Sequence, residues 1–261
     1  MRRMALLFAV VCIALTACAQ EAPAPPTPIL EDPTAWATAT PVEEPTPLPS
    51  PTPEPTAVPW RPAFSGEACE PSETRSCAVL FVLPDQFYAS HTLSLPPQFE
   101  RAGYAVMMGS NVSETVSICN SALNPYNQQP IEVEVQLADV QVTDYDAIVY
   151  AGGYGCRSQW NEAQALRIAR EAVEQGVVVG AIGCGPTILA HAGVLVGREA
   201  SICALDVPVK QGDDYCELLE SLGAICSDAQ IVRDGLIVTA WQASRYFVPG
   251  IIEVVNEQDA Q

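Results

Sequence analysis

The strongest constraint on the fold is the stretch VVGAIGCGPTILA at residues 178–190. A β-branched apolar run leads into a turn rich in glycine, and a run of helix-forming residues follows. This order is typical of a nucleophile elbow, in which a strand ends in a sharp turn that presents one side chain at the mouth of an α/β sheet. The chemistry therefore depends on which residue occupies the bend, and the reactive candidate here is Cys184.

The first eighteen residues have the pattern of an export signal. Arg2 and Arg3 precede an apolar run at 5–15 that is too short to span a membrane. The run ends in LTAC at 15–18, which resembles a bacterial lipoprotein box. That resemblance implies cleavage before Cys18 and a lipid on its thiol, which would anchor the protein to the cell membrane with its domain outside the cytoplasm. An ordinary secretory signal with a chance cysteine is the alternative.

A tether is predicted at residues 19–66, because 14 of the 23 prolines lie between Pro23 and Pro62. Proline has no amide donor and a fixed φ, so such a tract favours extended polyproline II and builds no core. At about 3.1 Å per residue it would reach on the order of 100 Å. Residues 67–261 have a globular composition, and their number suits one α/β domain with a sizeable core.

The net charge of −19 at pH 7 excludes some partners. A phosphate backbone needs Lys and Arg to replace its counterions, so we expect no nucleic-acid binding. The same charge disfavours docking of the domain on anionic lipid. Nothing in the sequence calls for a cofactor, and none is expected.

Eight cysteines lie outside the signal and the anchor, and an even number on an exported protein suggests disulfides. They are Cys69, Cys77, Cys119, Cys156, Cys184, Cys203, Cys216 and Cys226. Cys69 and Cys77 flank a polar loop before the first strand and are expected to pair. Cys119 and Cys156 fall in long loops and are a second candidate pair. No C-x-x-C motif is present and only two histidines occur, so we expect no metal site.

The hydrophobic pattern predicts strands alternating with helices. Strands are expected at 78–84, 104–108, 131–135, 147–150, 177–182, 229–232 and 236–239. Helices are expected at 92–102, 161–175, 186–192, 213–222 and 243–255, the second of them capped by Asn161. This alternation predicts a doubly wound, mostly parallel α/β sheet.

Three motifs in the right order give the chain a family resemblance. They are DYDAIV at 144–149 leading into GGYG at 152–155, AI at 181–182 followed by GPTILAHAGVL at 185–195, and DGLIVTA at 234–240. With these motifs the chain resembles the ThiJ/PfpI family of the class I glutamine amidotransferase-like superfamily. The resemblance implies a flavodoxin-like fold with helices on both faces of the sheet. It also implies a site made of an elbow cysteine, a nearby acidic residue and a histidine. Activities known in the family are peptidase, glyoxalase or deglycase, isocyanide hydratase and chaperone.

The chain departs from the family at the elbow. The family pattern is Ala-Ile-Cys-x-Gly-Pro, whereas this chain has Gly183 at the cysteine position and Cys184 one place later. Glycine adopts positive φ at little steric cost, so Gly183 suits a strained bend better than Cys184 does. Two interpretations of Cys184 remain open. A slip of one residue makes it a nucleophile, and otherwise it is a buried thiol or half of a disulfide.

The two partner positions also differ. Matching the chain to the family places His91 where the acidic residue is expected, and Cys203 where the histidine is expected. His91, Cys184 and Cys203 then form a rearranged Cys/His site, if they converge. Alternatively, His91 is a solvated loop residue and Cys184 pairs with Cys203.

Glycines mark the expected pocket. Gly152 and Gly153 at the end of a strand offer backbone amides to a negative oxygen, the usual oxyanion arrangement of this fold. Together with Gly183 and Gly185 they predict a pocket at the carboxyl ends of the strands.

Three functional hypotheses follow. The first is a catalytically altered or inactive member of the family, anchored at the cell surface, that binds a small molecule or a partner. The second is a cysteine-dependent hydrolase or deglycase with Cys184 as nucleophile, the Gly153 amide as oxyanion donor and His91 as base. The third is a chaperone-like surface protein that uses the homodimer interface common in the family.

Overall fold

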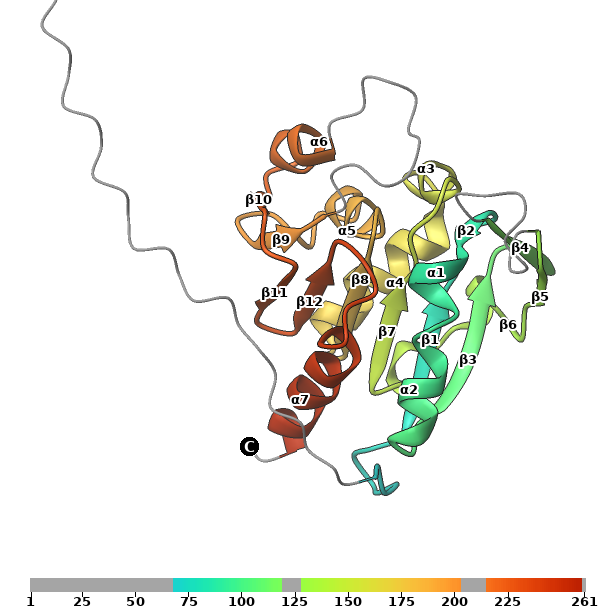
Figure 1. Cartoon of the computed structure of the whole chain (residues 1–261). Helices are drawn as coiled ribbons and strands as arrows, with labels where there is room; N and C mark the ends of the chain where they lie inside the picture. Colours follow the sequence, from blue (N-terminus) through green and yellow to red (C-terminus); the bar gives the residue numbers. More distant parts are fainter. Residues whose placement is uncertain (1–67, 119–127, 203–214, 260–261) are drawn as a thin grey trace, which may run out of the picture. The chain divides into compact units, whose positions relative to one another are not determined.

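A seven-stranded sheet forms the centre of the domain (Figure 1). The computed structural model describes residues 68–118, 128–202 and 215–259. The strand order is β11-β12-β8-β7-β1-β3-β6, and only the β11–β12 pair is antiparallel. The strands are β1 (Ala78–Val82), β3 (Ala105–Ser110), β6 (Val135–Gln136), β7 (Ala147–Tyr150), β8 (Val178–Ile182), β11 (Ile231–Asp234) and β12 (Ile237–Ala240). The doubly wound, flavodoxin-like α/β fold predicted from the sequence is confirmed.

Helices and two small sheets surround this centre. The helices are α1 (Ala89–Thr92), α2 (Pro96–Arg101), α3 (Cys156–Gln159), α4 (Ala163–Glu174), α5 (Pro186–His191), α6 (Tyr215–Ser221) and α7 (Phe247–Asp259), with 3-10 turns η1 (Leu137–Asp139) and η2 (Val142–Asp144). One small sheet joins β2 (Phe87–Tyr88), β4 (Glu114–Ile118) and β5 (Pro130–Glu132). The other pairs β9 (Glu199–Ser201) with β10 (Ile225–Ser227). Within the described residues, no helix is long and apolar enough to span a membrane.

Each face of the sheet has its own apolar core, because successive side chains of a strand point to opposite faces. In β1, Leu80 and Val82 belong to the core that includes α4 and α5. Val79 and Phe81 belong to the core that includes α2 and α7. The central strands are buried on both faces, which explains why β1, β7 and β8 are almost entirely apolar.

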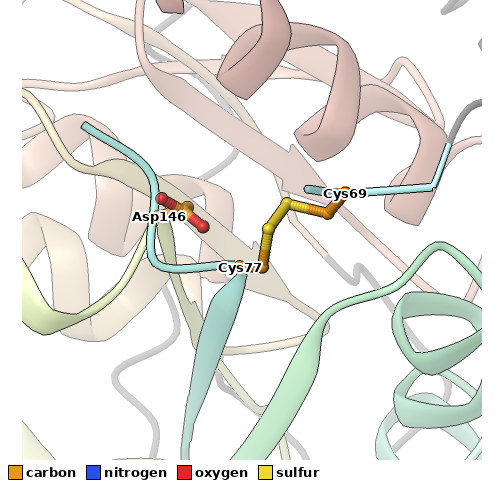
Figure 2. Close-up of side chains that lie close together, drawn as sticks. All are labelled: Cys69, Cys77 and Asp146. Atoms are coloured by element: carbon orange, nitrogen blue, oxygen red, sulfur yellow. A yellow bond between two sulfur atoms is a disulfide. The ribbon is translucent and has the colours of Figure 1, made fainter. Parts of the chain in front are cut away.

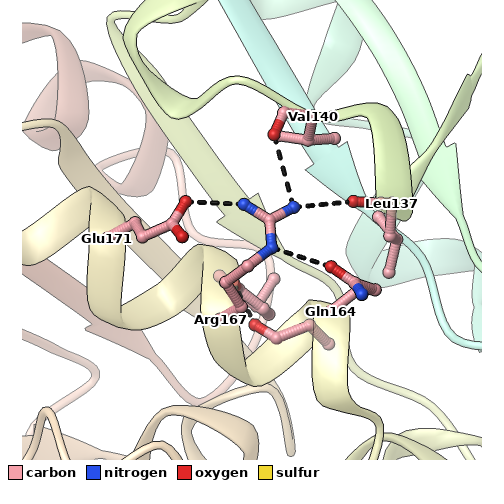
Figure 3. Close-up of polar contacts among 7 residues, drawn as sticks. Leu137, Val140, Gln164, Arg167 and Glu171 are labelled. Carbon is pink, nitrogen blue, oxygen red and sulfur yellow. Dashed lines mark hydrogen bonds and ion pairs between the residues drawn. The ribbon is translucent and has the colours of Figure 1, made fainter.

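Arg167 of α4 fixes the segment that leads into β7 (Figure 3). Its guanidinium donates to the carbonyls of Leu137 at 3.0 Å and Val140 at 3.3 Å, and it pairs with Glu171 at 2.6 Å. A further bond joins Arg167 Nε to Gln164 Oε1 at 2.7 Å. The Arg167 guanidinium thus satisfies backbone carbonyls at the η1 turn and holds the segment that precedes the central strand β7.

Several local expectations need correction. Glu162, not Asn161, caps α4, and its carboxylate accepts from the Ala165 amide. The strand expected at 131–135 divides into β5 and β6, which belong to different sheets. The glycine, proline and apolar signals located the other predicted elements in the described residues to within a few residues.

Disulfides join Cys69 to Cys77 and Cys216 to Cys226. The first is the pair expected from the sequence. The second candidate pair is not formed, because Cys156 is a free thiol that begins α3 and contacts the Ala151 carbonyl at 3.8 Å. Its expected partner, Cys119, lies outside the described residues.

Candidate functional site

The bend between β8 and α5 is occupied by glycine. Gly183 has a φ of +65°, in the left-handed region where a side chain is strained. Its amide donates to the Ala240 carbonyl at 2.9 Å, which ties the bend to the neighbouring strand β12. Pro186 then occupies the first turn of α5, where its missing amide costs nothing. The residue at the apex of the elbow therefore carries no side chain that could react.

The loop after β7 packs against the loop after β1 with almost no space between their backbones. A Cβ atom added at Gly153, where φ is +144°, would lie 2.4 Å from the Gln86 carbonyl oxygen. One added at Gly155 would lie 1.6 Å from the Asp85 carbonyl oxygen. The Tyr88 amide donates to the Gly152 carbonyl at 2.8 Å, and Phe87 forms a bridge with Gly153. These glycines allow the two loops to close over the carboxyl ends of the central strands.

The sulfur of Cys184 is turned into the protein, against this glycine loop. The Gly153 amide donates to Cys184 Sγ at 3.1 Å, and the thiol lies 3.1 Å from the Gly153 carbonyl oxygen. Cys184 is only 1% exposed. The backbone donor that was expected to stabilise a substrate oxyanion is therefore occupied by the protein's own sulfur.

A second thiol lies beside the first. Cys156, also 1% exposed, donates its amide to the Gly153 carbonyl at 3.1 Å, and its side chain hydrogen-bonds the Cys184 side chain. The bond from Cys156 lowers the pKa of Cys184 against the opposing effect of burial, and backbone donors add to the lowering. Burial raises the pKa of Cys156 well above its ordinary value. The two thiols thus differ in character, with Cys184 the better thiolate.

Arg157 and Tyr215 complete the surroundings of the two thiols. The positive charge of Arg157 contributes to the lowered pKa of Cys184. Tyr215, at the start of α6, accepts a hydrogen bond from Arg157. Burial, followed by the charges of the two cysteines, raises the pKa of Tyr215 to about 12. Neither residue was singled out from the sequence, because they meet the elbow only through the packing of α3 and α6.

Trp160 connects α3 to the elbow helix. Its indole nitrogen donates to Thr187 Oγ1 at 2.7 Å, and that hydroxyl donates to the Cys184 carbonyl at 2.7 Å. The ring stacks on His191, with 4.9 Å between centroids. Burial lowers the pKa of His191, which favours its neutral form. These contacts hold the backbone of Cys184 in place and give His191 a packing role.

The structure brings together only part of the predicted site. Gly152, Gly153, Gly183, Cys184 and Gly185 meet at the elbow. A Cβ added at Gly152 would lie 3.0 Å from the Cys184 nitrogen, which shows how closely the two loops approach. The backbone of His91 lies in α1, but its side chain is outside what the structure describes, and so is all of Cys203. The convergence of these two residues on Cys184 stays a prediction.

A different cluster, at the amino ends of the central strands β1 and β7, offers atoms of the kind that bind metals (Figure 2). The sulfurs of Cys69 and Cys77 lie within 4.8 Å of a carboxylate oxygen of Asp146. However, the two sulfurs are joined in a disulfide, and the Asp146 oxygens accept from the amides of Ser76 at 3.1 Å and Ala78 at 3.2 Å. A cavity of about 470 Å³ opens beside this carboxylate. In this state the cluster caps the start of β1, and its ligand atoms are already engaged.

Comparison with known proteins agrees with the fold and its motifs. The model of the DJ-1/PfpI family matches residues 77–253, which is more than half of the chain. An uncharacterized protein of Methanocaldococcus jannaschii is 32% identical over 168 residues, covering 64% of this chain and 75% of that protein. A deglycase of Thermococcus kodakarensis is 31% identical over 116 residues, covering 44% of this chain and 62% of that protein.

Among solved structures, a ThiJ/PfpI domain protein from Brachyspira murdochii superposes with a TM-score of 0.60 at 21% identity. The match covers 70% of this chain and 98% of that one, and at this identity it supports the fold alone. The family match and the elbow architecture lead to the same conclusion: this chain belongs to the DJ-1/PfpI family.

Proposed function

We propose that this chain is a surface-anchored DJ-1/PfpI domain that has given up the family's carbonyl and hydrolytic chemistry and acts by binding a small molecule or a partner. One observation carries the proposal: glycine occupies the bend, and the displaced sulfur of Cys184 accepts from the Gly153 amide. A nucleophile needs a path to its substrate, and an oxyanion needs a free donor. Both requirements conflict with a buried Cys184 bonded to that amide.

Attachment to the membrane is part of the same proposal. A lipid on Cys18 would hold the protein, and the proline-rich tract 19–66 would keep residues 67–261 away from the bilayer. Expression of the full chain in a bacterial host with a lipoprotein pathway tests this part. We expect the protein in the membrane fraction, and Cys18→Ala should move it to the soluble exported fraction. Equal distribution of both forms would contradict the anchor.

A second candidate is a cysteine-dependent deglycase that uses Cys184. Two observations favour it: the name of the Thermococcus kodakarensis relative, and the hydrogen bond from Cys156 that lowers the pKa of the Cys184 thiol. This candidate requires Cys184 to leave the Gly153 amide during turnover. It also requires a base, for which His91 is the sequence-based candidate.

Turnover measurements separate the two candidates. The purified chain is assayed for release of glyoxal-derived adducts from amines and thiols, beside Cys184→Ser and Gly183→Cys. If the proposal holds, the wild type and Cys184→Ser give equal rates at the level of the uncatalysed reaction. Turnover in the wild type that disappears in Cys184→Ser would establish the deglycase instead. Gly183→Cys places a thiol at the family position and reports whether the rest of the pocket is still competent.

A further inference from the structure

Cys156 and Cys184 make up the free thiols of the described residues, and they lie together under the glycine loop. Both are fixed by Gly153. The Cys156 amide donates to its carbonyl, and the Cys184 sulfur contacts its amide and its carbonyl, each at 3.1 Å. The two side chains also hydrogen-bond each other. Two thiols held in contact by one backbone residue form an arrangement that a lone buried cysteine does not have.

We propose that Cys156 and Cys184 are a redox-active dithiol that a hydroperoxide oxidises to a disulfide. This inference does not rest on the proposed function, because it needs neither a nucleophile at the bend nor a free oxyanion donor. It assigns a chemical use to the displaced cysteine. The same oxidation would also lock α3 to the elbow, since the two cysteines belong to these separate segments.

The surroundings assign different roles to the two sulfurs. Cys184 Sγ lies 3.1 Å from both the amide nitrogen and the carbonyl oxygen of Gly153. The hydrogen bond from Cys156 lowers the pKa of the Cys184 thiol against the opposing effect of burial, and the charge of Arg157 adds to the lowering. Burial raises the pKa of the Cys156 thiol well above its ordinary value, which favours the neutral form. We therefore assign Cys184 as the attacking sulfur and Cys156 as the resolving one.

The reaction balances with a hydroperoxide as the oxidant. The Cys184 thiolate attacks the peroxide O–O bond, which breaks and leaves a sulfenic acid on Cys184 and an alkoxide or hydroxide that takes up a proton. The Cys156 sulfur then attacks the sulfenic sulfur, an S–S bond forms, and water leaves with the Cys156 proton. Overall, two thiols lose two electrons and two protons, and hydrogen peroxide becomes two waters.

Burial determines which oxidants fit. Both cysteines are 1% exposed, so a small hydroperoxide reaches them more readily than a bulky disulfide does.

The two existing disulfides, Cys69–Cys77 and Cys216–Cys226, join residues that are eight and ten positions apart along the chain, respectively. They provide internal references, because peroxide should leave their peptides unchanged.

The experiment is peptide mapping of the full chain after hydrogen peroxide, with free thiols alkylated in denaturant and digestion without reductant. We expect a new cross-linked peptide containing residues 156 and 184, with the loss of two hydrogens, and its disappearance on treatment with dithiothreitol. Any of three outcomes would overturn the proposal: alkylation of both thiols after peroxide, a disulfide between Cys156 and Cys119, or a disulfide between Cys184 and Cys203.

Conservative variants test the roles of the two sulfurs, with circular dichroism to verify folding. In Cys156→Ser the cross-link should be lost, and a sulfenic-acid probe such as dimedone should label Cys184. In Cys184→Ser, Cys156 should stay reduced and unlabelled. Ser158→Ala is the matched control, since Ser158 lies on α3 and its hydroxyl donates to the Gly155 carbonyl at 2.7 Å, and it should oxidise like the wild type. Dimedone labelling of Cys156 in Cys184→Ser would reverse the assigned roles and contradict the inference.

Discussion

Gly183→Ala tests the conformation of the bend, and its cost is calculable from the structure. At a φ of +65° a residue with a Cβ atom is strained by about 1–2 kcal/mol. The same substitution reduces the freedom of the unfolded chain, which stabilises by about 0.4–1 kcal/mol. The free energy of unfolding should therefore fall by up to about 1.6 kcal/mol, a decrease in Tm of up to a few degrees for a domain of this size.

Two matched glycines separate backbone strain from crowding. Gly193 has a φ of +82° with nothing within 4 Å of an added Cβ, so Gly193→Ala should show the strain alone. Gly185 has an ordinary φ, but its added Cβ would lie 2.4 Å from the Tyr150 carbonyl oxygen. Gly185→Ala should therefore cost more, about 1–3 kcal/mol, through crowding of a buried site.

Urea unfolding followed by circular dichroism measures all three variants on the same scale. The expected order of stability loss is Gly185→Ala above Gly183→Ala, with Gly183→Ala and Gly193→Ala similar. If Gly183→Ala raised the midpoint, as a glycine in an ordinary conformation would, residue 183 would not occupy a left-handed bend.

Three further predictions concern the surroundings of the elbow. Gly155→Ala should separate the loops after β1 and β7, because its Cβ would lie 1.6 Å from the Asp85 carbonyl oxygen. The separation should weaken the hydrogen bond from the Tyr88 amide to Gly152, so hydrogen exchange at this amide should become faster. Unchanged exchange would contradict the close contact of the two loops. Burial raises the pKa of Tyr215 to about 12 in the folded protein, from about 10 in the unfolded chain, so the stability that it contributes is present below pH 10 and is lost between pH 10 and 12. Urea midpoints across this range should fall more steeply in the wild type than in Tyr215→Phe, and parallel slopes would count against its burial. Since burial lowers the pKa of His191, its neutral form stabilises the fold above the unfolded pKa, and stability declines as the pH falls through that range. His191→Gln should flatten this decline in stability and remove the accompanying change in the fluorescence of Trp160, which stacks on His191. If the variant and the wild type lost stability identically in acid, His191 would not be the group that titrates.

The sequence carries clear information wherever a local rule decides the outcome. Continuous apolar runs locate β1, β7 and β8, since strands buried on both faces need apolar residues throughout. Gly183 was predicted to occupy the bend because glycine adopts positive φ at the least cost, and its φ of +65° agrees. Cys69 and Cys77 are only eight positions apart across a turn, so their bridge was also accessible to local reasoning.

Other features depend on distances that no local pattern encodes. Loop position alone predicts that Cys156 pairs with Cys119, whereas packing of α3 on the elbow places Cys156 beside Cys184. The only available signal was that Cys156 follows Gly153 by three residues, within the loop expected to reach the elbow. Arg157 and Tyr215 meet this site through tertiary packing, which explains why the sequence did not indicate them. Glu162 in place of Asn161 as the cap of α4 is a shift of one residue that propensity does not resolve.

The position of one sulfur atom decides whether the bend is bare or carries the thiol of Cys184. A sulfur anomalous difference map from crystals of the reduced protein measures it directly. We expect a peak for Cys184 about 3.1 Å from the Gly153 nitrogen, with no side chain at the apex of the turn. A peak at the apex, facing an open cleft with the His91 imidazole beside it, would instead make Cys184 the nucleophile of the elbow.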